Sequence, residues 1–401
     1  MVRVIPLDIH KFAKKNELMK ERIKTYNNAN SQIALSFIDH LVAEGCSEAR
    51  LFFYIAKTGS IMRIMKESKL TFTFKEATKQ DIEKLMSLIN SKPYRALTKA
   101  SLAFTLKKLV QYAKTGRTER GAPFPPEVAW LKITFKEKNP RVTADKVLSE
   151  QEFAELMSHV NSPRDRAMIY VFYEGALRPG ELLNMKIGSV QFLDQYCVVT
   201  TRGKTGEKRI PLVISMQPLL EWLKQHPDKD NPEAPLWPSL STRTYGKPIS
   251  YPAFIRIVQM IAKRAGLKKE VWPYLFRHSR LTFLADKLTE SKLEQFAGWT
   301  LGSKMTRTYV HFSGKDLDAS VLGLYGIKGE TNNESILKPK LCPRCNNQIM
   351  PDEKRCSHCG LVIDPLLAAS LAEHAVNNAD LVKRLDEIEK KLELFMGETR
   401  G

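Results

Sequence analysis

Apolar residues recur at three- and four-residue steps between residues 31 and 120. The segments SQIALSFIDHLV and SLAFTLKKLVQYAK carry this spacing, which gathers apolar side chains on one face of a helix. Lys107 and Lys114 add positive charge to the last of these helices. Residues 1–30 are instead polar and basic. The pattern predicts a helical domain over residues 31–120, preceded by a basic arm over residues 1–30.

A break in this pattern separates two domains. Residues 121–147 contain GAPFPPE and FKEKNPR, whose glycine, proline and charged residues are typical of a linker. Ser149 and Glu152 then fit a capping box at the start of a helix. Residues 148–329 are mainly helical in pattern, and their hairpin lies in YCVVTTRGKTGEKRIPL. We expect a multidomain, mainly α chain whose second domain is α+β, with a small β-hairpin or sheet.

The C-terminal part holds four of the six cysteines, in two CxxC pairs separated by ten residues, within residues 341–364. Four thiolates at this spacing predict a tetrahedral zinc ribbon, and a site filled by four protein ligands is structural. The two other cysteines are isolated, so we expect no disulfide framework and a reducing cytoplasm as the compartment. The spacing leaves open whether the ribbon contacts DNA or a protein. The expected ligands are Cys342, Cys345, Cys356 and Cys359.

A helix is expected over residues 365–397, where apolar residues alternate at four- and three-residue steps with charges between them. Two heptads of this kind are consistent with a short coiled coil. They are equally consistent with a helix that packs on its own domain, since a firm assignment needs about three or four heptads. The residues of this stripe are Leu381, Leu385, Ile388, Leu392 and Phe395.

The net charge of the chain indicates which class of partner it binds. Lys and Arg outnumber Asp and Glu by 63 to 44, which gives a formal net charge of +19. Such an excess favours a polyanion, with nucleic acid ahead of an anionic membrane surface. The longest apolar run, AMIYVFYEGAL, is far shorter than the roughly 20 residues of a membrane span. The sequence therefore predicts a nucleic-acid partner and no membrane segment.

Two arginines stand out by their positions. Arg178, in EGALRPGELLNM, precedes Pro179, which suits the first turn of a helix. At such a junction, free backbone N–H groups and a guanidinium can bind an anion together. Arg277, in WPYLFRHSRLTFLADKL, falls on the apolar stripe of its helix, where a charge is costly unless a negative group meets it. A structural pair between Arg178 and Glu181, and a buried Arg277–carboxylate pair, are the alternatives.

Three further residues are informative because of their order along the chain. Lys204 lies at the hairpin tip, and Trp299 and Tyr309 follow in GWTLGSKMTRTYVHFSG. Alone, the lysine would be solvated and Tyr309 would be a core residue. Together with ALRPGEL, GKTGEKRIPL and LFRHSRLTFLA, they resemble the tyrosine recombinase (phage integrase, Xer-like) family, and the last segment looks like its archaeal variants. The resemblance covers residues 148–327 closely, and residues 31–115 only in position and helical pattern.

The resemblance implies a role for each matching residue. Tyr309 matches the nucleophile of the family, and Trp299 the position usually held by His and sometimes by Trp. Tyr274 departs from the family, which usually has His or Lys there, and His278 follows Arg277 as is common. The implied catalytic residues are Arg178, Lys204, Tyr274, Arg277, Trp299 and Tyr309, with Glu181 and His278 in support.

The function implied by the resemblance is site-specific DNA recombination (an integrase) without a catalytic metal. Tyr309 would attack a phosphodiester and form a 3′-phosphotyrosine, while the two arginines neutralise the phosphate and Lys204 protonates the leaving 5′-oxygen. The implied partners are double-stranded DNA, held by both domains, and further copies of the chain, from dimer to tetramer. The alternatives are a type IB topoisomerase-like activity, and a non-enzymatic DNA-binding or regulatory protein with a decayed recombinase domain.

Overall fold

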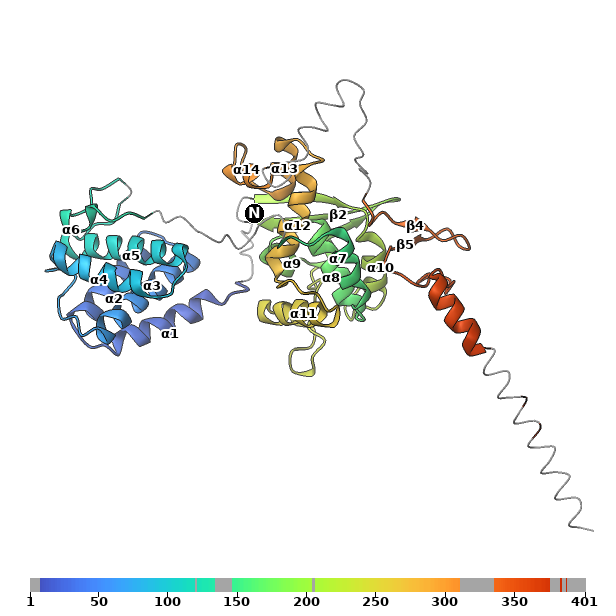
Figure 1. Cartoon of the computed structure of the whole chain (residues 1–401), viewed down its shortest axis with the longest axis horizontal. Coiled ribbons are helices and arrows are strands. Elements are labelled where there is room, and N and C mark those ends of the chain that lie inside the picture. The colour runs from blue at the N-terminus through green and yellow to red at the C-terminus, as the bar shows by residue number, and fades with distance from the viewer. Residues whose placement is uncertain are drawn as a thin grey trace, which may run out of the picture. The chain divides into compact units, whose positions relative to one another are not determined.

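The chain folds as two units in this computed structural model, which describes residues 8–119, 121–133, 146–203, 206–310 and 335–375, together with residues 383 and 387. The first unit comprises Asp8–Arg141, and the main part of the second begins at Val142. The first unit is built from helices, drawn in blue to blue-green in Figure 1. They are α1 (Phe12–Lys24), α2 (Ala29–Ala43), α3 (Glu48–Glu67), α4 (Lys79–Ser91), α5 (Ala96–Thr115) and α6 (Pro126–Ala129).

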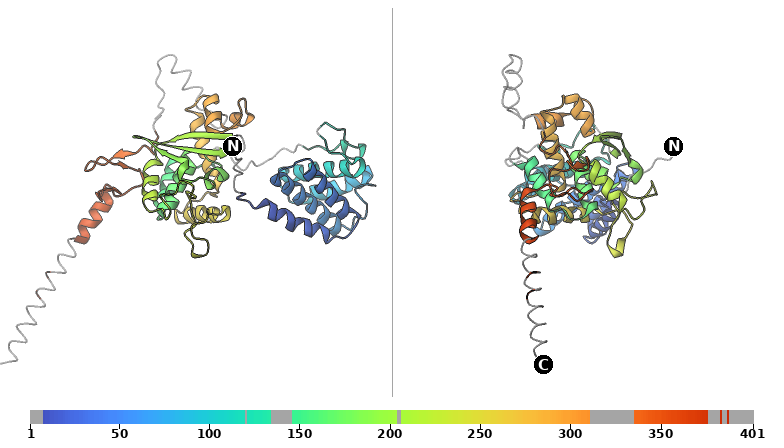
Figure 2. Two further views of the ribbon diagram at one scale, coloured as in Figure 1. Left: turned by 180° about the vertical axis from the view of Figure 1, so that it is seen from behind. Right: turned by 90° about the vertical axis from the view of Figure 1, so that its right-hand side faces the viewer.

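An apolar core joins the helices of the first unit. Capping boxes at Asn28 and Thr78 satisfy backbone N–H groups in the first turns of α2 and α4, so polar side chains fix where these helices begin. The core contains Phe37, Ile55 and Leu106, one each from α2, α3 and α5, all fully buried. The left view of Figure 2 shows these helices as one bundle from behind. The helical periodicity of the sequence therefore corresponds to one packed bundle.

The sequence predicts a basic arm over residues 1–30, but from residue 12 onward the structure shows a packed helix instead. Helix α1 occupies most of that segment, and its Ile23 is buried in the core of the bundle. Asn16, on the same helix, donates to the backbone oxygen of Glu48 at 3.0 Å. The apolar pattern is weak here because α1 contributes few residues to the core and covers α3 partly through polar contacts.

The beginning of the expected linker also packs against the bundle. Leu131 is buried in the core, and Lys107 is only 6% exposed. The ammonium group of Lys107 donates to the backbone oxygens of Ala129 at 3.0 Å and Leu131 at 3.3 Å. Lys107 is thus a structural cross-link between α5 and the segment after α6, and not a surface charge. The remainder of the expected linker, residues 134–145, lies outside the described residues.

The second unit combines helices with a small antiparallel sheet, which confirms the expected fold class (Figure 1). Its elements before the cysteine region are α7 (Glu150–Ser158), α8 (Pro163–Glu174), α9 (Pro179–Leu183), η2 (Ile187–Ser189), β1 (Val190–Phe192), β2 (Cys197–Gly203), β3 (Gly206–Leu212), α10 (Met216–Lys224), η3 (Thr242–Thr244), α11 (Tyr251–Arg264), α12 (Pro273–Ala285), α13 (Glu290–Ala297) and α14 (Lys304–Val310). Ser149 and Glu152 form the predicted capping box of α7.

The predicted hairpin is strands β2 and β3, with Cys197 opposite Leu212 and Gly203 opposite Gly206. Strand β1, which the sequence analysis did not predict, adds a third strand beside β2. Helix α8 packs at the centre of the unit, where the rings of Phe153 and Tyr173 stack with centroids 3.9 Å apart. The sheet and α8 together position the chain segments on which the residues of the candidate site lie.

The C-terminal segment carries a second small sheet, β4 (Lys340–Leu341) paired with β5 (Gln348–Ile349). The chain is helical again over residues 365–375. The residues of the predicted coiled-coil stripe lie outside the described residues. Within the described part of the chain, no helix is both long and apolar enough to span a membrane.

Candidate active site and metal centre

Arg178 stands at the helix junction that the sequence predicts. It is the N-cap of α9, and Pro179 occupies the first turn of that helix. The Nη1 of Arg178 donates to Oε1 of Glu181 at 2.6 Å, and its backbone N–H donates to Oε2 at 2.9 Å. The side chain of Arg178 is nevertheless 27% exposed. The structural Arg–Glu pair is therefore present, and it leaves the guanidinium accessible to an anion.

Arg277 lies on the buried face of α12, as its place on the apolar stripe predicts, and is 4% exposed. Its guanidinium donates to the backbone oxygen of Ala176 and to that of Ala297, the latter at 2.7 Å. These carbonyls lie at the C-terminal ends of α8 and α13, where helix dipoles favour a cation. Burial and the neighbouring Arg178 lower the pKa of Arg277 to about 10. Arg277 is therefore a cation at neutral pH, fixed by three helices.

Glu181 is the buried negative charge of the site. Its side chain is 3% exposed, and its Oε2 lies 3.1 Å from Nζ of Lys208 and 4.0 Å from Nη1 of Arg277. Burial opposes the ionisation of Glu181, but Lys208 and the two arginines outweigh it and lower its pKa. Gly203 leaves room for this carboxylate, because a Cβ at that position would lie 2.6 Å from its Oε1.

Lys208 is a site residue that the sequence analysis missed. Its side chain is 9% exposed, and burial lowers its pKa to about 8. The sequence does contain a signal for it. Side chains alternate along a strand, and Lys208 stands two residues before Ile210 and four before Leu212, both buried. The alternation in KRIPL thus directs this lysine to the inner face of the sheet.

Tyr309, on α14, is both a packed side chain and a member of the site. It is 2% exposed, and its ring lies 5.5 Å from that of Trp299, centroid to centroid, at 23° between the planes. Its hydroxyl oxygen lies 2.7 Å from Nδ1 of His278. Burial raises the pKa of Tyr309, while Arg277 and Arg178 act in the opposite direction. Tyr309 is therefore a core residue that lies close to the two arginines, and its role as a nucleophile stays a prediction.

Two predicted residues remain, Tyr274 and Lys204, and the structure describes only the first of them. Tyr274, one turn before Arg277 on α12, is 42% exposed. Lys204 lies outside the described residues, between the ends of β2 and β3. The residues that the structure brings together are Arg178, Glu181, Lys208, Arg277, His278, Trp299 and Tyr309.

The assembled charges suit a phosphate diester. Arg178, Lys208 and Arg277 contribute +3 and Glu181 contributes −1, so the cluster carries +3 − 1 = +2. A cleft of about 350 Å³ borders the cluster and is lined by Lys208 and Trp299 among others. Fixed guanidinium groups bind phosphate oxygens in pairs and stabilise negative charge as it develops. The net positive charge of the cluster therefore suits an anionic group such as a phosphate diester.

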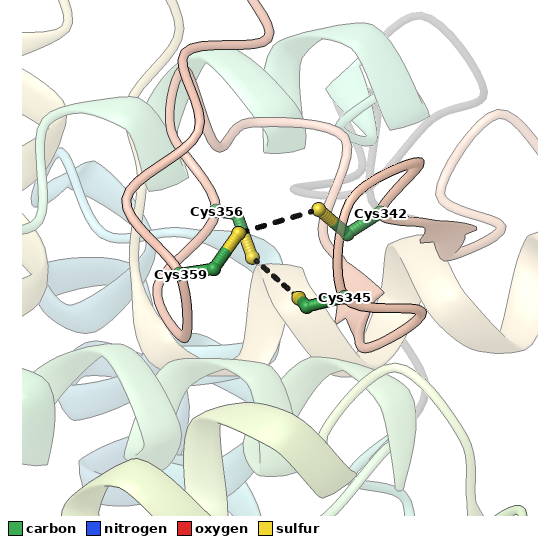
Figure 3. Close-up of side chains that lie close together, drawn as sticks. All are labelled: Cys342, Cys345, Cys356 and Cys359. Carbon is green, nitrogen blue, oxygen red and sulfur yellow. Dashed lines mark hydrogen bonds between the residues drawn. The ribbon is translucent and has the colours of Figure 1, made fainter.

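The four clustered cysteines form a candidate metal centre. Their ligand atoms all lie within 4.8 Å of one another. The sulfur atoms of Cys342 and Cys359 are 3.6 Å apart, as are those of Cys345 and Cys356. A tetrahedral ion with metal–sulfur bonds of about 2.3 Å would separate its sulfurs by about 3.8 Å. Figure 3 shows the four side chains pointing toward one another. The four thiols therefore fit one tetrahedral metal ion.

The cysteine region is fastened to helix α8 by Asp352. The side chain of Asp352 is 1% exposed, and its Oδ2 lies 2.5 Å from Nη1 of Arg166. The hydroxyl of Tyr170 donates to the same carboxylate. Burial and the Asp352 carboxylate raise the pKa of Tyr170 well above its ordinary value. A buried and paired contact of this kind makes the cysteine region part of the second unit.

Comparisons with known proteins find similar sequences and structures. Residues 146–315 match the phage integrase family. A tyrosine recombinase of Synechococcus elongatus is 32% identical over 144 residues, which is 34% of this chain and 44% of that protein. The tyrosine recombinase XerA of Pyrococcus furiosus is 28% identical over 188 residues, 46% of this chain and 64% of that protein. The chain thus spans less than two thirds of the length of these relatives.

Solved structures share the fold. The XerH site-specific recombinase bound to its palindromic difH substrate, in a post-cleavage complex, has a TM-score of 0.54 at 16% identity, covering 77% of this chain and 94% of that one. A lambda integrase dimer bound to a COC′ core site also has a TM-score of 0.54 at 16% identity, covering 71% and 77%. At these identities the comparison establishes the fold alone.

Proposed function

We propose that the protein is a site-specific DNA recombinase, on the premise that residues 146–315 match the phage integrase family. It would cleave one DNA strand through Tyr309, form a 3′-phosphotyrosine, and pass the strand to the 5′-hydroxyl of another. The proposal rests on one observation. Arg178 and Arg277 both lie next to the buried carboxylate of Glu181, and both act on the pKa of Tyr309.

Each residue has a role in this chemistry. Arg178 and Arg277 bind the scissile phosphate and stabilise the charge of the transition state. Trp299 packs against Tyr309 and orients its ring. A lysine protonates the leaving 5′-oxygen, and the chain offers Lys204 at the hairpin tip and Lys208 in the cluster. Tyr274, at the exposed end of α12, contacts the DNA. Every step is carried by side chains, so the reaction needs no catalytic metal.

The proposed partners are double-stranded DNA and further copies of the chain. The net charge of +19 supports DNA binding that weakens steeply with salt. Exchange of strands between two duplexes requires more than one protomer, so the active form is a dimer or tetramer on DNA. Two of the structural neighbours are described as a dimer and a tetramer on DNA. We place the protein in the reducing cytoplasm, where thiols persist.

We further propose that the four cysteines hold a structural zinc ion. Purified protein should contain about one zinc per chain, because four thiolates complete a tetrahedral site and leave no open position. Cys345→Ser should lower the zinc content and loosen the ribbon, whereas Cys46→Ser, outside the cluster, should leave the zinc content unchanged. Metal analysis by mass spectrometry measures this. Equal zinc content in the Cys345→Ser variant and the wild type would contradict the assignment.

Glu181→Gln should destabilise the second unit by ~3 kcal/mol, since three cations would lose their buried counter-charge. The pKa of Glu181 is lowered in the folded protein, so its contribution is present above the ordinary value of 4.5 and is lost as the pH falls below it. The stability difference between wild type and variant should therefore be full at pH 7 and shrink below pH 4.5. Urea unfolding across pH tests this, with Glu207→Gln, an exposed neighbour on β3, as the control.

Plasmid assays test the proposed function against its closest alternative. A site-specific recombinase should convert a plasmid that carries two copies of its DNA site into recombinant circles, and the Arg178→Ala variant should not. The site is first identified as the duplex that the wild-type chain captures covalently from a randomised pool. A topoisomerase of the same chemistry would relax supercoiled plasmid that lacks any such site and give no recombinants. A non-enzymatic DNA-binding protein would shift the DNA in gels and do neither. Recombinants that persist in the Arg178→Ala variant would contradict the proposed site.

A further inference from the structure

Tyr309 must lose its proton before its oxygen can bond to phosphorus, and the structure places a histidine ring nitrogen at hydrogen-bond distance from that oxygen. We propose that His278 is the proton acceptor for Tyr309, a proposal that rests on the recombinase function proposed above. The hydroxyl oxygen of Tyr309 lies 2.7 Å from Nδ1 of His278. A proton can pass directly between atoms at this distance.

The contact is held by two helices. His278 lies on α12, next to the anchored Arg277, and Tyr309 lies on α14, which packs on α12. The two rings are nearly parallel, at 25° between planes, with centroids 5.8 Å apart. Trp299 stacks on Tyr309 as well and restricts its rotation. The imidazole is only partly buried.

The charges around the hydroxyl favour its ionisation. Burial raises the pKa of Tyr309, and Arg277, on the same helix as His278, and Arg178, at the start of α9, act against that rise. Glu294, the buried one of the two acidic residues of α13, accepts hydrogen bonds from the hydroxyl of Thr306 and from two backbone N–H groups. The cations stabilise a phenolate, but they carry no lone pair that could accept its proton.

Other side chains of the site are poorer acceptors. Tyr274 is exposed and offers a phenol, which has no basic nitrogen. The carboxylate of Glu181 is held by Arg178 and Lys208. Histidine is the side chain whose neutral form is basic and populated near neutral pH. His278 therefore combines the required contact with the required chemistry.

The Tyr309 proton moves to Nδ1 of His278, and a lone pair of the Tyr309 oxygen forms a bond to the scissile phosphorus. The bond from phosphorus to the 5′-oxygen breaks, its electron pair stays on that oxygen, and a lysine supplies the proton that makes the 5′-hydroxyl. In strand joining the sequence reverses, and the His278 imidazolium returns the proton to Tyr309 as it leaves.

The test is single-turnover cleavage of a nicked DNA duplex, selected from a randomised pool by its covalent capture on the full-length wild-type chain. His278→Asn should slow adduct formation by about 100-fold or more, the usual contribution of a general base. It should also remove the ascending limb of the pH–rate profile between about pH 5 and pH 8, where histidine titrates. His159→Asn, an exposed histidine elsewhere in the unit, is the matched control.

Two further readouts separate a catalytic from a structural role. A duplex with sulfur at the bridging 5′ position has a leaving group that needs no proton, so it should rescue Lys204→Ala or Lys208→Ala but not His278→Asn. Added imidazole should partly restore His278→Gly, because it can occupy the vacated space and accept the proton. Thermal melting of each variant reports whether it is folded.

The outcomes distinguish this proposal from the one on which it rests. A wild type that forms adducts, together with a folded His278→Asn that keeps the wild-type rate and pH profile, overturns the role of His278 and leaves the recombinase function intact. Rescue of His278→Asn by the sulfur-bridged duplex overturns it as well. A wild type that captures no duplex from the pool overturns both proposals.

Discussion

Tyr309→Phe should abolish the covalent protein–DNA adduct and leave the fold and the affinity for DNA nearly unchanged. Phenylalanine keeps the ring that stacks on Trp299 but lacks the oxygen that would attack phosphorus. The lost contact with His278 should cost about 1 kcal/mol of unfolding free energy. Denaturing gels of nicked duplexes, run after incubation in EDTA, measure the adduct, and salt-dependent gel shifts measure binding.

Tyr245→Phe is the matched control for this variant, because Tyr245 is 61% exposed and lies in the same unit. It should form adducts at the wild-type rate. If Tyr309→Phe formed adducts as well as the wild type does, Tyr309 would be a packing residue and the nucleophile would have to lie elsewhere. If both variants lost adducts, the assay would be reporting a general loss of tyrosine contacts rather than loss of the nucleophile.

Arg277→Ala should lower the cleavage rate by about 1,000-fold, the scale expected when a preorganised donor to a developing anion is removed. The variant should also be less stable by ~3 kcal/mol, because the backbone oxygens of Ala176 and Ala297 would lose a buried donor and Glu181 a nearby cation. Arg277→Lys keeps the charge without the two-pronged geometry, so we expect a rate between those of the wild type and the alanine variant.

The control for Arg277 is Arg264→Ala, at the exposed end of α11. It removes the same charge from the same unit and should change the cleavage rate by less than about twofold, since single surface charges act weakly. Single-turnover rates and urea unfolding separate the catalytic effect from the structural one. A folded Arg277→Ala variant that cleaves at the wild-type rate would show that the buried arginine is only a structural anchor.

The sequence predicts best those features that local patterns determine. The junction at Arg178, the hairpin of β2 and β3, and the burial of Arg277 each follow from a helix start, an alternating strand or a helical stripe. The zinc-ribbon spacing likewise anticipates the cysteine cluster. These signals act over a few residues, so one sequence is enough to detect them.

Features that depend on contacts between distant segments are harder to predict. The polar helix α1 packs because of what it meets in space, and its own periodicity is weak. The pairing of Asp352 with Arg166 joins segments 186 residues apart. Lys208 shows an intermediate case, because the strand alternation predicts that it faces inward, whereas its partner Glu181 depends on how α9 packs beside β2.

Mapping the adduct shows directly whether Tyr309 becomes covalently linked to DNA. Adducts formed in EDTA would be digested with trypsin and nuclease, and the peptide TYVHFSGK, residues 308–315, examined by mass spectrometry. The account predicts a nucleotide attached to Tyr309 through its 3′-phosphate, and a released strand that begins with a 5′-hydroxyl. Attachment to another residue, linkage through a 5′-phosphate, or cleavage that requires a divalent metal would contradict it.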